Sequence, residues 1–347
     1  MINVNSTPFS YGGKIQKNIV VIGGGTGTYT VLSGLKKYPS DLFDITAIVT
    51  VADSGGSTGR LRDEFGYLPV GDFRMALVAL ADDSDVGQAL RSLFLHRFEK
   101  GEGLKGHNFG NLFLVALTDI FGSEEKAIEY ASQILRIRGK VLPISKQKLT
   151  LSAEYEDGSI LHGETHIDEP PEGHDGKKRI KKLWVDEGAV ISESAKEAIE
   201  GADLIIVGPG DLYTSILANI VVGGAQEALA SSRGKFLYIS NLMSKYGQTH
   251  GFSVKDHLDE LTTYAGRVPD YVLVNSEPLP GDILEKYAEQ QEFQVVDDLK
   301  DVSGQRIIRG NLLAFSEQKK NSGDTLKRSL IRHDSEKIAS VVISLPQ

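Results

Sequence analysis

Hydrophobic positions along the chain follow two patterns, short continuous runs and longer stripes with helical spacing. Apolar runs occur at residues 18–22, 45–51, 204–207, 236–239 and 271–274. Runs of this kind are typical of parallel strands that are covered on both faces. Between the runs, apolar residues recur every three or four positions, as from Val254 to Leu261. Strands that alternate with helices predict an α/β fold with a Rossmann-like, doubly wound and mostly parallel sheet.

Two stretches depart from this alternation. Residues 72–138 carry helical stripes and predict a helical subdomain, whereas residues 148–186 predict an inserted β-hairpin with Asp157-Gly158 as a type I′ turn. The polar segment 168–182 is expected to be a solvated loop that leads into a strand at 183–185. We expect residues 1–17 to form a flexible N-terminal tail and residues 18–347 to form a single domain.

Composition excludes several classes of protein. The chain has no cysteine, which excludes disulfides, thiol catalysis and cysteine-ligated metals. Its net charge of −9 argues against binding a nucleic acid polymer, because such binding needs clustered positive charge. No segment reaches the roughly 18 consecutive apolar residues of a membrane span, and the first 17 residues do not resemble a signal peptide. We therefore expect a cytoplasmic protein without membrane insertion.

Glycine is enriched, with 37 residues, and a glycine-rich loop follows the first predicted strand. Glycine loops at strand ends let backbone N–H groups approach a phosphate, and the next helix adds its positive N-terminus. The candidate ligand residues here are Gly24, Gly25, Thr26, Gly27 and Thr28. Thr28 stands where a dinucleotide fingerprint has its third glycine, so a tight turn without a ligand is the alternative. Asp53 follows the second strand, where a ribose-binding acid would lie, and NAD binding therefore also stays open.

The loop after the second strand carries more chemistry. It combines an acid, hydroxyl groups, glycines and arginine within ten residues, and an arginine can bind two phosphate oxygens at once. This combination favours a phosphate or diphosphate site over a purely structural turn. Its candidate ligand residues are Asp53, Ser54, Gly55, Gly56, Ser57, Thr58 and Arg60.

Three further segments are expected to line the same cleft. They contribute His107, Asn108 and Asn111, then Gly208, Gly210 and Asp211, and finally Asn241 with the polar segment 241–251 that follows another strand end. For His107 and its neighbouring amides, the alternative to lining the cleft is a purely structural role. Asp72 is a candidate N-cap of the helix that follows Gly71. No histidine spacing predicts a zinc site, and the nucleophile elbow and Walker lysine loop are both absent. A metal site, a hydrolase triad and P-loop chemistry are therefore not expected.

Ten motifs taken in order resemble the gluconeogenesis factor family of YvcK- and CofD-like proteins. The resemblance runs from about residue 18 to the end of the chain, and the order of the motifs makes it specific. The motifs occupy residues 23–27, 48–62, 71–81, 101–120, 138–143, 156–164, 208–222, 240–257, 272–276 and 331–334.

The resemblance implies a Rossmann-like cytoplasmic protein that binds UDP-sugars such as UDP-N-acetylglucosamine. It also implies a regulatory role in cell morphogenesis and cell-wall precursor supply during gluconeogenic growth, and it places Arg332 among the ligand-binding residues. No cofactor is then required, and a homodimer is compatible with the sequence. Another nucleotide diphosphate is the alternative ligand.

A distant branch of the same fold is 2-phospho-L-lactate transferase, which moves a phospholactyl group from a guanine-nucleotide donor to a deazaflavin hydroxyl. Asp53 and Asp72 are the candidate catalytic residues for this alternative, with Mg²⁺ as the cofactor. Both branches usually carry an acid at the position of Ser54, and a serine is a poor substitute as a metal ligand or base. A binding or regulatory protein is therefore expected rather than an enzyme.

Overall fold

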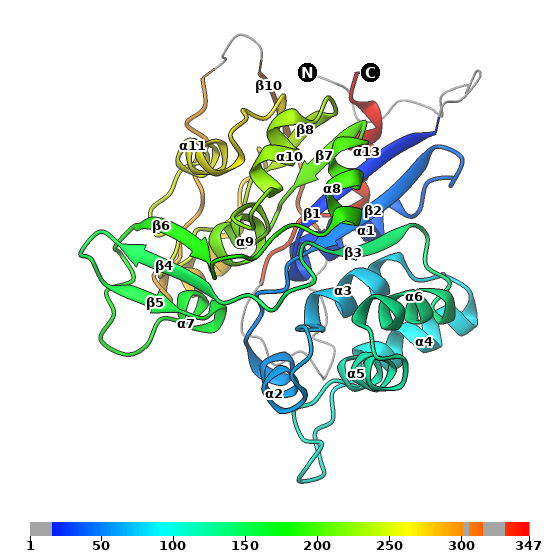
Figure 1. The fold of residues 1–347 in the computed structure, drawn as a ribbon. Coiled ribbons are helices and arrows are strands. Elements are labelled where there is room, and N and C mark those ends of the chain that lie inside the picture. Colours follow the sequence, from blue (N-terminus) through cyan, green and yellow to red (C-terminus); the bar gives the residue numbers. More distant parts are fainter. Residues whose placement is uncertain (1–15, 301–304, 315–329, 347) are drawn as a thin grey trace.

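A computed structural model describes residues 16–300, 305–314 and 330–346. Its centre is a seven-stranded sheet with the order β10-β9-β8-β7-β1-β2-β3, and all of its pairings are parallel (Figure 1). The strands are β1 (Lys17–Gly23), β2 (Phe43–Val49), β3 (Lys140–Pro143), β7 (Leu204–Val207), β8 (Lys235–Ile239), β9 (Tyr271–Asn275) and β10 (Arg306–Gly310). The five predicted strands are confirmed, and β3 and β10 are additional strands at the two edges.

Helices cover both faces of this sheet, as the doubly wound prediction requires. Helices α1 and α13 pack on each other over one face, and α8, α10 and α11 lie together over the other (Figure 1). These elements are α1 (Gly25–Leu35), α8 (Glu193–Glu200), α10 (Ala225–Ser231), α11 (Val254–Ala265) and α13 (Ser335–Ser344). A π-helical turn η1 (Leu212–Leu217) runs into α9 (Ala218–Ile220), and α12 (Gly281–Ala288) follows β9. The central strands are consequently buried on both sides.

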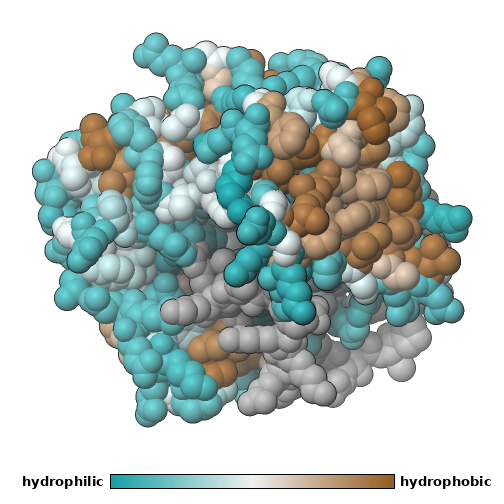
Figure 2. Space-filling view, turned by 90° about the horizontal axis from the view of Figure 1, so that it is seen from below, coloured by the Kyte–Doolittle hydropathy of each residue, from teal (hydrophilic) through white to brown (hydrophobic). Residues whose placement is uncertain are grey.

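The helical subdomain is the connection between β2 and β3. It consists of α2 (Gly56–Phe65), α3 (Gly71–Leu80), α4 (Asp85–Leu95), α5 (Phe109–Phe121) and α6 (Glu124–Ile134). Asn108 caps the start of α5 by accepting the N–H groups of Gly110 and Asn111, and Gly122 ends the helix in a left-handed conformation. Seen from below, this subdomain presents a hydrophobic face (Figure 2).

The inserted hairpin is part of a small antiparallel sheet with the order β5-β4-β6. It comprises β4 (Leu151–Tyr155), β5 (Ile160–His162) and β6 (Ile180–Val185), with α7 (Glu164–Asp168) after β5. The predicted type I′ turn is wrong, because Asp157 lacks the positive φ that this turn needs; only Gly158 has it, at 82°. The Gly158 N–H donates to the carbonyl of Tyr155 at 2.9 Å, so the loop is a type I turn followed by a left-handed glycine.

Residues 1–15 of the expected tail lie outside the described part of the chain, and β1 already begins at Lys17. From β1 the chain moves to β2 on one side, while β7 pairs with the other side of β1. The strand order therefore reverses between β1 and β7. Ligands of open α/β sheets bind at such a reversal, outside the carboxyl ends of the strands.

Candidate functional site

The loops after β1 and β7 meet at this reversal of strand order. A Cβ atom on Gly27 would lie 1.8 Å from the carbonyl oxygen of Pro209, so the two backbones approach more closely than any other residue allows. Asn241, after β8, donates from Nδ2 to the Gly210 carbonyl at 2.8 Å and thereby holds the second loop in place. Three of the predicted loops are thus joined at one edge of the sheet.

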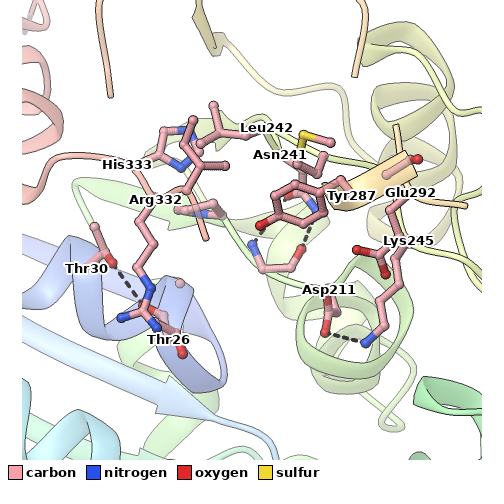
Figure 3. Close-up of a pocket in the computed structure, with 16 residues that line it drawn as sticks. Thr26, Thr30, Asp211, Asn241, Leu242, Lys245, Tyr287, Glu292, Arg332 and His333 are labelled. Atoms are coloured by element: carbon pink, nitrogen blue, oxygen red, sulfur yellow. Dashed lines mark hydrogen bonds and ion pairs between the residues drawn. The ribbon is translucent and has the colours of Figure 1, made fainter. Parts of the chain in front are cut away.

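A cavity of about 160 Å³ opens beside these loops (Figure 3). The C-terminal segment before α13 forms its far wall, and from this wall Arg332 extends toward Thr26 and Thr30 of α1 (Figure 3). Lys245 lies on the opposite side, near Asp211. The lining residues are Thr26, Gly27, Thr30, Pro209, Gly210, Asp211, Asn241, Leu242, Met243, Ser244, Lys245, Tyr287, Glu292, Ile331, Arg332 and His333.

The cavity has two chemically different ends. Thr26 and Gly27 in the first turn of α1 offer a hydroxyl and backbone N–H groups, and Gly24 provides no side-chain cap for that helix. Asp72 takes the Gly25 N–H, but the next N–H groups of this turn, together with the Arg332 guanidinium, suit an anion such as a diphosphate. Leu242, Met243 and Tyr287 make the other end apolar, with the Glu292 carboxylate beside them. An elongated ligand with a charged part and a flat or apolar part fits this division.

Asp72 has a different role from the predicted one. The N-cap of α3 is Val70, so the predicted N-cap role of Asp72 is wrong. The carboxylate instead accepts the N–H of Gly25 at 2.8 Å, where it occupies an amide at the start of α1. The aspartate thus ties the helical subdomain to the first glycine loop, and its oxygen packs directly against Gly24.

Four carboxylates gather between the second glycine loop and the insertion. Burial raises the pKa of Asp53, and it raises the pKa of Asp72 to about 7 with help from the charge of Asp53. Burial and the charges of Asp53 and Asp168 raise the pKa of Glu164 well above its usual value. Within the described residues, no three histidine, aspartate or glutamate side chains are close enough together to hold a metal ion. The group is therefore a buried cluster of acidic side chains that resist losing all of their protons at once, without a metal-ligand geometry of its own.

The second glycine loop is held by the insertion and by the subdomain. Ser54 Oγ accepts the N–H of Thr165 in α7 at 3.0 Å, and it lies 3.0 Å from the Thr165 hydroxyl. At the start of α2, Asn111 Nδ2 donates to Ser57 Oγ at 3.4 Å and to Thr58 Oγ1 at 3.3 Å. The three predicted residues of the subdomain thus lie against this loop, since His107 Nδ1 is 3.2 Å from Ser57 Oγ and Asn108 is the α5 cap.

His107 sits in an electropositive, enclosed place. Burial is the main reason why its pKa is lowered, and the positive charge of Arg60 adds to the effect. Arg60 itself is exposed on α2, and its Nη2 donates to the Lys105 carbonyl at 3.4 Å. The guanidinium therefore points along the 101–106 loop.

Lys245 joins the insertion to the sheet edge. Its ammonium group is nearly buried, lies 3.1 Å from the Asp211 carboxylate, and also pairs with Asp168 of α7. Gln248 Nε2 donates to the same Asp168 carboxylate at 3.0 Å. The ammonium group offsets part of the negative charge that the insertion brings to the site.

The predicted site residues separate into two groups. The cavity brings together Thr26, Gly27, Gly210, Asp211, Asn241 and Arg332. The remaining candidates lie outside the cavity lining, in the loop starts, in the second glycine loop or in the subdomain; they are Gly24, Gly25, Thr28, Asp53, Ser54, Gly55, Gly56, Ser57, Thr58, Arg60, Asp72, His107, Asn108, Asn111 and Gly208.

Sequence reasoning missed Tyr287 and Glu292. Both lie in or after α12, which has no glycine-rich loop in front of it, so no local signal marked them. Lys245 was not named as a ligand residue, but it lies in the polar segment 241–251 that was expected to line the cleft, and it does line the cavity.

No helix in the described ranges is both long and apolar enough to cross a membrane.

Comparison with known proteins gives several relatives. The chain is 44% identical over 285 residues to the gluconeogenesis factor of Halalkalibacterium halodurans, which covers 82% of this chain and 85% of that protein. It is 40% identical over 335 residues to the gluconeogenesis factor of Bacillus subtilis, covering 95% and 98% of the two chains.

A crystal structure of a Bacillus halodurans protein superposes with a TM-score of 0.83 at 38% identity, over 95% of this chain and all of the other. A second crystal structure from the same organism, described as a member of the upf0052 family, gives a TM-score of 0.82. The family model of 2-phospho-L-lactate transferase CofD matches residues 19–313. The family model spans most of the chain, and the relatives cover most of it at 40% identity or more, so these matches show that the chain belongs to the CofD family, together with the gluconeogenesis factors.

Proposed function

We propose that this protein is a gluconeogenesis factor that binds a nucleotide sugar of the UDP-N-acetylglucosamine type in the cavity between α1 and the C-terminal segment. The diphosphate would lie at the start of α1 beside Arg332, and the base or sugar would lie toward Tyr287. The observation that supports this proposal most is the position of the Arg332 guanidinium and the α1 N-terminus at the reversal of strand order.

The biological role follows from the relatives and is likewise a proposal. Relatives that match nearly full length carry the name gluconeogenesis factor. We infer that ligand occupancy lets this protein adjust cell-wall precursor supply and cell shape during gluconeogenic growth, from the cytoplasm where nucleotide sugars are made. In this role the protein needs no catalytic residue.

Isothermal titration calorimetry tests the binding. UDP-N-acetylglucosamine is titrated into the full chain, with UDP, GDP and NAD as comparison ligands. We expect saturable binding of the UDP-sugar, a smaller signal for UDP, and none for NAD. The absence of heat at millimolar UDP-sugar, with folding verified by circular dichroism, would refute the proposal, and tight NAD binding would favour the dinucleotide interpretation instead.

The Arg332→Ala variant tests the site. Loss of a charge-assisted hydrogen bond to phosphate should weaken binding by roughly 1.5–3 kcal/mol, which is about a ten- to 150-fold higher Kd. Arg233→Ala is the matched control, because Arg233 is exposed between α10 and β8 and away from the cavity. Equal affinities of the two variants would place the ligand elsewhere.

A second candidate function is a phospholactate-type transferase, which the family model and one observation favour. Asp72 lies at the α1 N-terminus, and the Asp53 carboxylate at the start of α2 is close enough to raise the pKa of Asp72. Mg²⁺ in phosphoryl-transfer sites is commonly held by one or two carboxylates together with substrate phosphates, and the family model is that of a transferase. These two residues would hold the ion, which would neutralise charge on the donor's phosphates. The role of the chain would be to position the donor through the loops after β1 and β2.

Ser54 is the residue that discriminates the two functions. Ser54→Asp introduces the acid that the family resemblance implies at this position, and Ser54→Asn is a neutral control of the same shape. Either side chain can still accept the Thr165 N–H that Ser54 accepts now. Mg²⁺-dependent transfer to a deazaflavin acceptor by the aspartate variant alone would support a branch that has lost catalysis. Transfer by the unchanged chain would instead establish an enzyme.

A further inference from the structure

A second cavity of about 390 Å³ lies between the C-terminal end of α2 and the chain that connects β3 to β4, two segments that pass close to each other (Figure 1). We call it the α2 cavity. It shares no lining residue with the cavity beside α1, and its volume lies within the range of roughly 300–1,000 Å³ that is usual for small-molecule sites. The lining residues of the α2 cavity are Arg62, Asp63, Gly66, Lys148, Leu149 and Thr150.

Arg62 brings unused hydrogen-bond donors to the α2 cavity. Its side chain is 24% exposed, and its Nε donates to the Asp63 carboxylate at 3.3 Å. In the described part of the chain, neither Nη group of Arg62 has a hydrogen-bond partner. A guanidinium group can bind two oxygen atoms of one phosphate at once. Arg62 therefore offers a planar pair of donors to an anion in this cavity.

Lys148 adds an ammonium group that the end of α2 holds in place. Gly66 ends this helix in a left-handed conformation with a φ of 76°, and a Cβ atom there would lie 3.2 Å from Lys148 Nζ. The last carbonyl groups of a helix carry partial negative charge, which attracts a cation to this position. Within residues 16–300, 305–314 and 330–346, the ammonium group has no carboxylate partner. A second cation thus lies beside the α2 cavity without a counter-ion.

The acids around the α2 cavity are already engaged with other groups. Asp63 is 71% exposed and accepts from Arg62, and Asp186 accepts the backbone N–H of Thr150 at 2.7 Å. The Thr150 hydroxyl makes no hydrogen bond to the described residues. The lining therefore combines a guanidinium, an ammonium and a hydroxyl group with a single carboxylate. In a chain with a net charge of −9, this is a local excess of positive charge that suits an anion.

We propose that the α2 cavity binds a phosphate ester of a small polar molecule, such as a sugar phosphate. A phosphate ester carries nearly two negative charges at neutral pH and three acceptor oxygens, which match the two cations and the hydroxyl group. A carboxylate carries one charge and leaves one cation without a partner. The described lining contains no aromatic ring, unlike that of the cavity beside α1 with Tyr287, so a nucleobase has no ring to stack on here.

Arg62 also connects the α2 cavity to the second glycine loop. Burial raises the pKa of Asp53, whereas hydrogen bonds from Gly55 and Thr58 and the charge of Arg62 lower it. A phosphate ester that pairs with Arg62 adds negative charge near Asp53 and favours the protonated form of that carboxyl group. Occupancy of the α2 cavity therefore acts on the loop that α7 and the helical subdomain hold.

Methyl-detected NMR of the full chain with labelled leucine, threonine and methionine methyl groups tests the proposal, because each cavity has its own reporters. Leu149 and Thr150 report on the α2 cavity, and Leu242 and Met243 report on the cavity beside α1. We expect glucose 6-phosphate to shift the Leu149 and Thr150 signals saturably and to leave the other pair unchanged. Glucose should cause no shift, and inorganic phosphate should shift the same signals with a higher Kd.

Arg62→Gln and Lys148→Gln each remove one charge and keep a polar side chain. We expect either variant to raise the Kd for glucose 6-phosphate at least about tenfold, through loss of a charge-assisted hydrogen bond. Arg60→Gln is the matched control on the same helix, because its guanidinium lies along the 101–106 loop. Lys146→Gln is the control for Lys148, because Lys146 is exposed and pairs with Glu125. Neither control residue lines the α2 cavity, and we expect changes below about twofold.

Three results would overturn the proposal. The first is the absence of Leu149 and Thr150 shifts with glucose 6-phosphate up to about 20 mM, in a chain shown to be folded. The second is a Kd that Arg62→Gln and Lys148→Gln leave equal to those of their controls. The third is equal affinity for inorganic phosphate, which would reduce the site to one for the anion alone.

The test stands even if Arg62→Gln does not fold, since Lys148 is exposed and its substitution retains the fold. Titration of the same sample with UDP-N-acetylglucosamine checks the other site separately. Binding there is expected to shift Leu242 and Met243, so failure at one cavity is distinguishable from failure at the other.

Discussion

Asp72 couples the protonation of a single carboxyl group to the stability of the first glycine loop. Burial and the neighbouring Asp53 raise its pKa from 3.8 to about 7 in the folded protein. The folded state therefore binds the proton more tightly than the unfolded state. Stability from this group is complete below about pH 4 and is lost as the pH rises toward 7 and slightly above. Above neutral pH the ionised Asp72 beside Asp53 destabilises the loop, and a bound cation or a proton would remove this repulsion.

Asp72→Asn should remove this pH dependence. The asparagine Oδ1 can still accept the Gly25 N–H, but it carries no charge beside Asp53. We expect the variant to be more stable than the unchanged chain at pH 8, on the order of 1 kcal/mol, and to lose less stability between pH 5 and pH 8. Urea denaturation across this range measures the effect. Asp63→Asn, at an exposed position of α2, is the control; a parallel shift in both variants would contradict the explanation.

Arg60 belongs to a motif that predicts phosphate binding, but its side chain does not reach the cavity. The sequence favours Arg60 as a phosphate ligand, but its guanidinium lies along the 101–106 loop and outside the cavity lining. For a ligand confined to the cavity, we expect Arg60→Ala to change the Kd less than about twofold, since surface charges act weakly at a distance. A loss as large as that of Arg332→Ala in calorimetry would show that the ligand extends to the second glycine loop.

At the scale of elements, Lys245 is a connection between the insertion and the sheet edge. Lys245→Met keeps the length of the side chain but leaves Asp168 beside Glu164 and Asp53 with less positive charge. We expect faster hydrogen exchange in α7 and in the loop after β8, with no change in α4 to α6. Lys255→Met removes an exposed i,i+4 pair with Asp259 and serves as the control. Unchanged exchange in α7 would mean that Ser54 and the hairpin hold the insertion without this ion pair.

Sequence patterns predicted the elements whose signals are local. The β-branched run that became β2 and the glycine loops at the ends of β1 and β7 could be read directly from the chain. Edge strands β3 and β10 could not, because β3 has only two aliphatic residues between Lys140 and Pro143, and β10 includes the charged Arg306 and Arg309. Helix α7 was expected as part of the hairpin, and its first turn depends on Ser54, more than a hundred residues away. Contacts over such separations leave no periodic pattern.

At the scale of the whole molecule, the cavity combines residues from distant parts of the chain. Thr26 lies near the start of the described chain and Arg332 lies near its end, and both line the cavity. Helix α13 makes this possible by packing on α1 so closely that a Cβ on Gly34 would lie 2.0 Å from the Ser335 carbonyl oxygen. Arg332 and His333 directly precede α13, so their position depends on this contact. The cavity wall is therefore set by helix packing on the sheet as much as by its own residues.

Gly34→Ala tests that dependence. Alanine in a helix normally stabilises it by about 1 kcal/mol relative to glycine. Here the new methyl group must push α13 away, so we expect a net loss of roughly 1–3 kcal/mol in urea denaturation and weaker UDP-sugar binding, although Gly34 does not line the cavity. Gly103→Ala is the control, because a Cβ there would meet no atom within 4 Å. If Gly34→Ala lost stability but bound the ligand unchanged, the C-terminal wall would be held by its pairing at Leu313 and His333 rather than by α13.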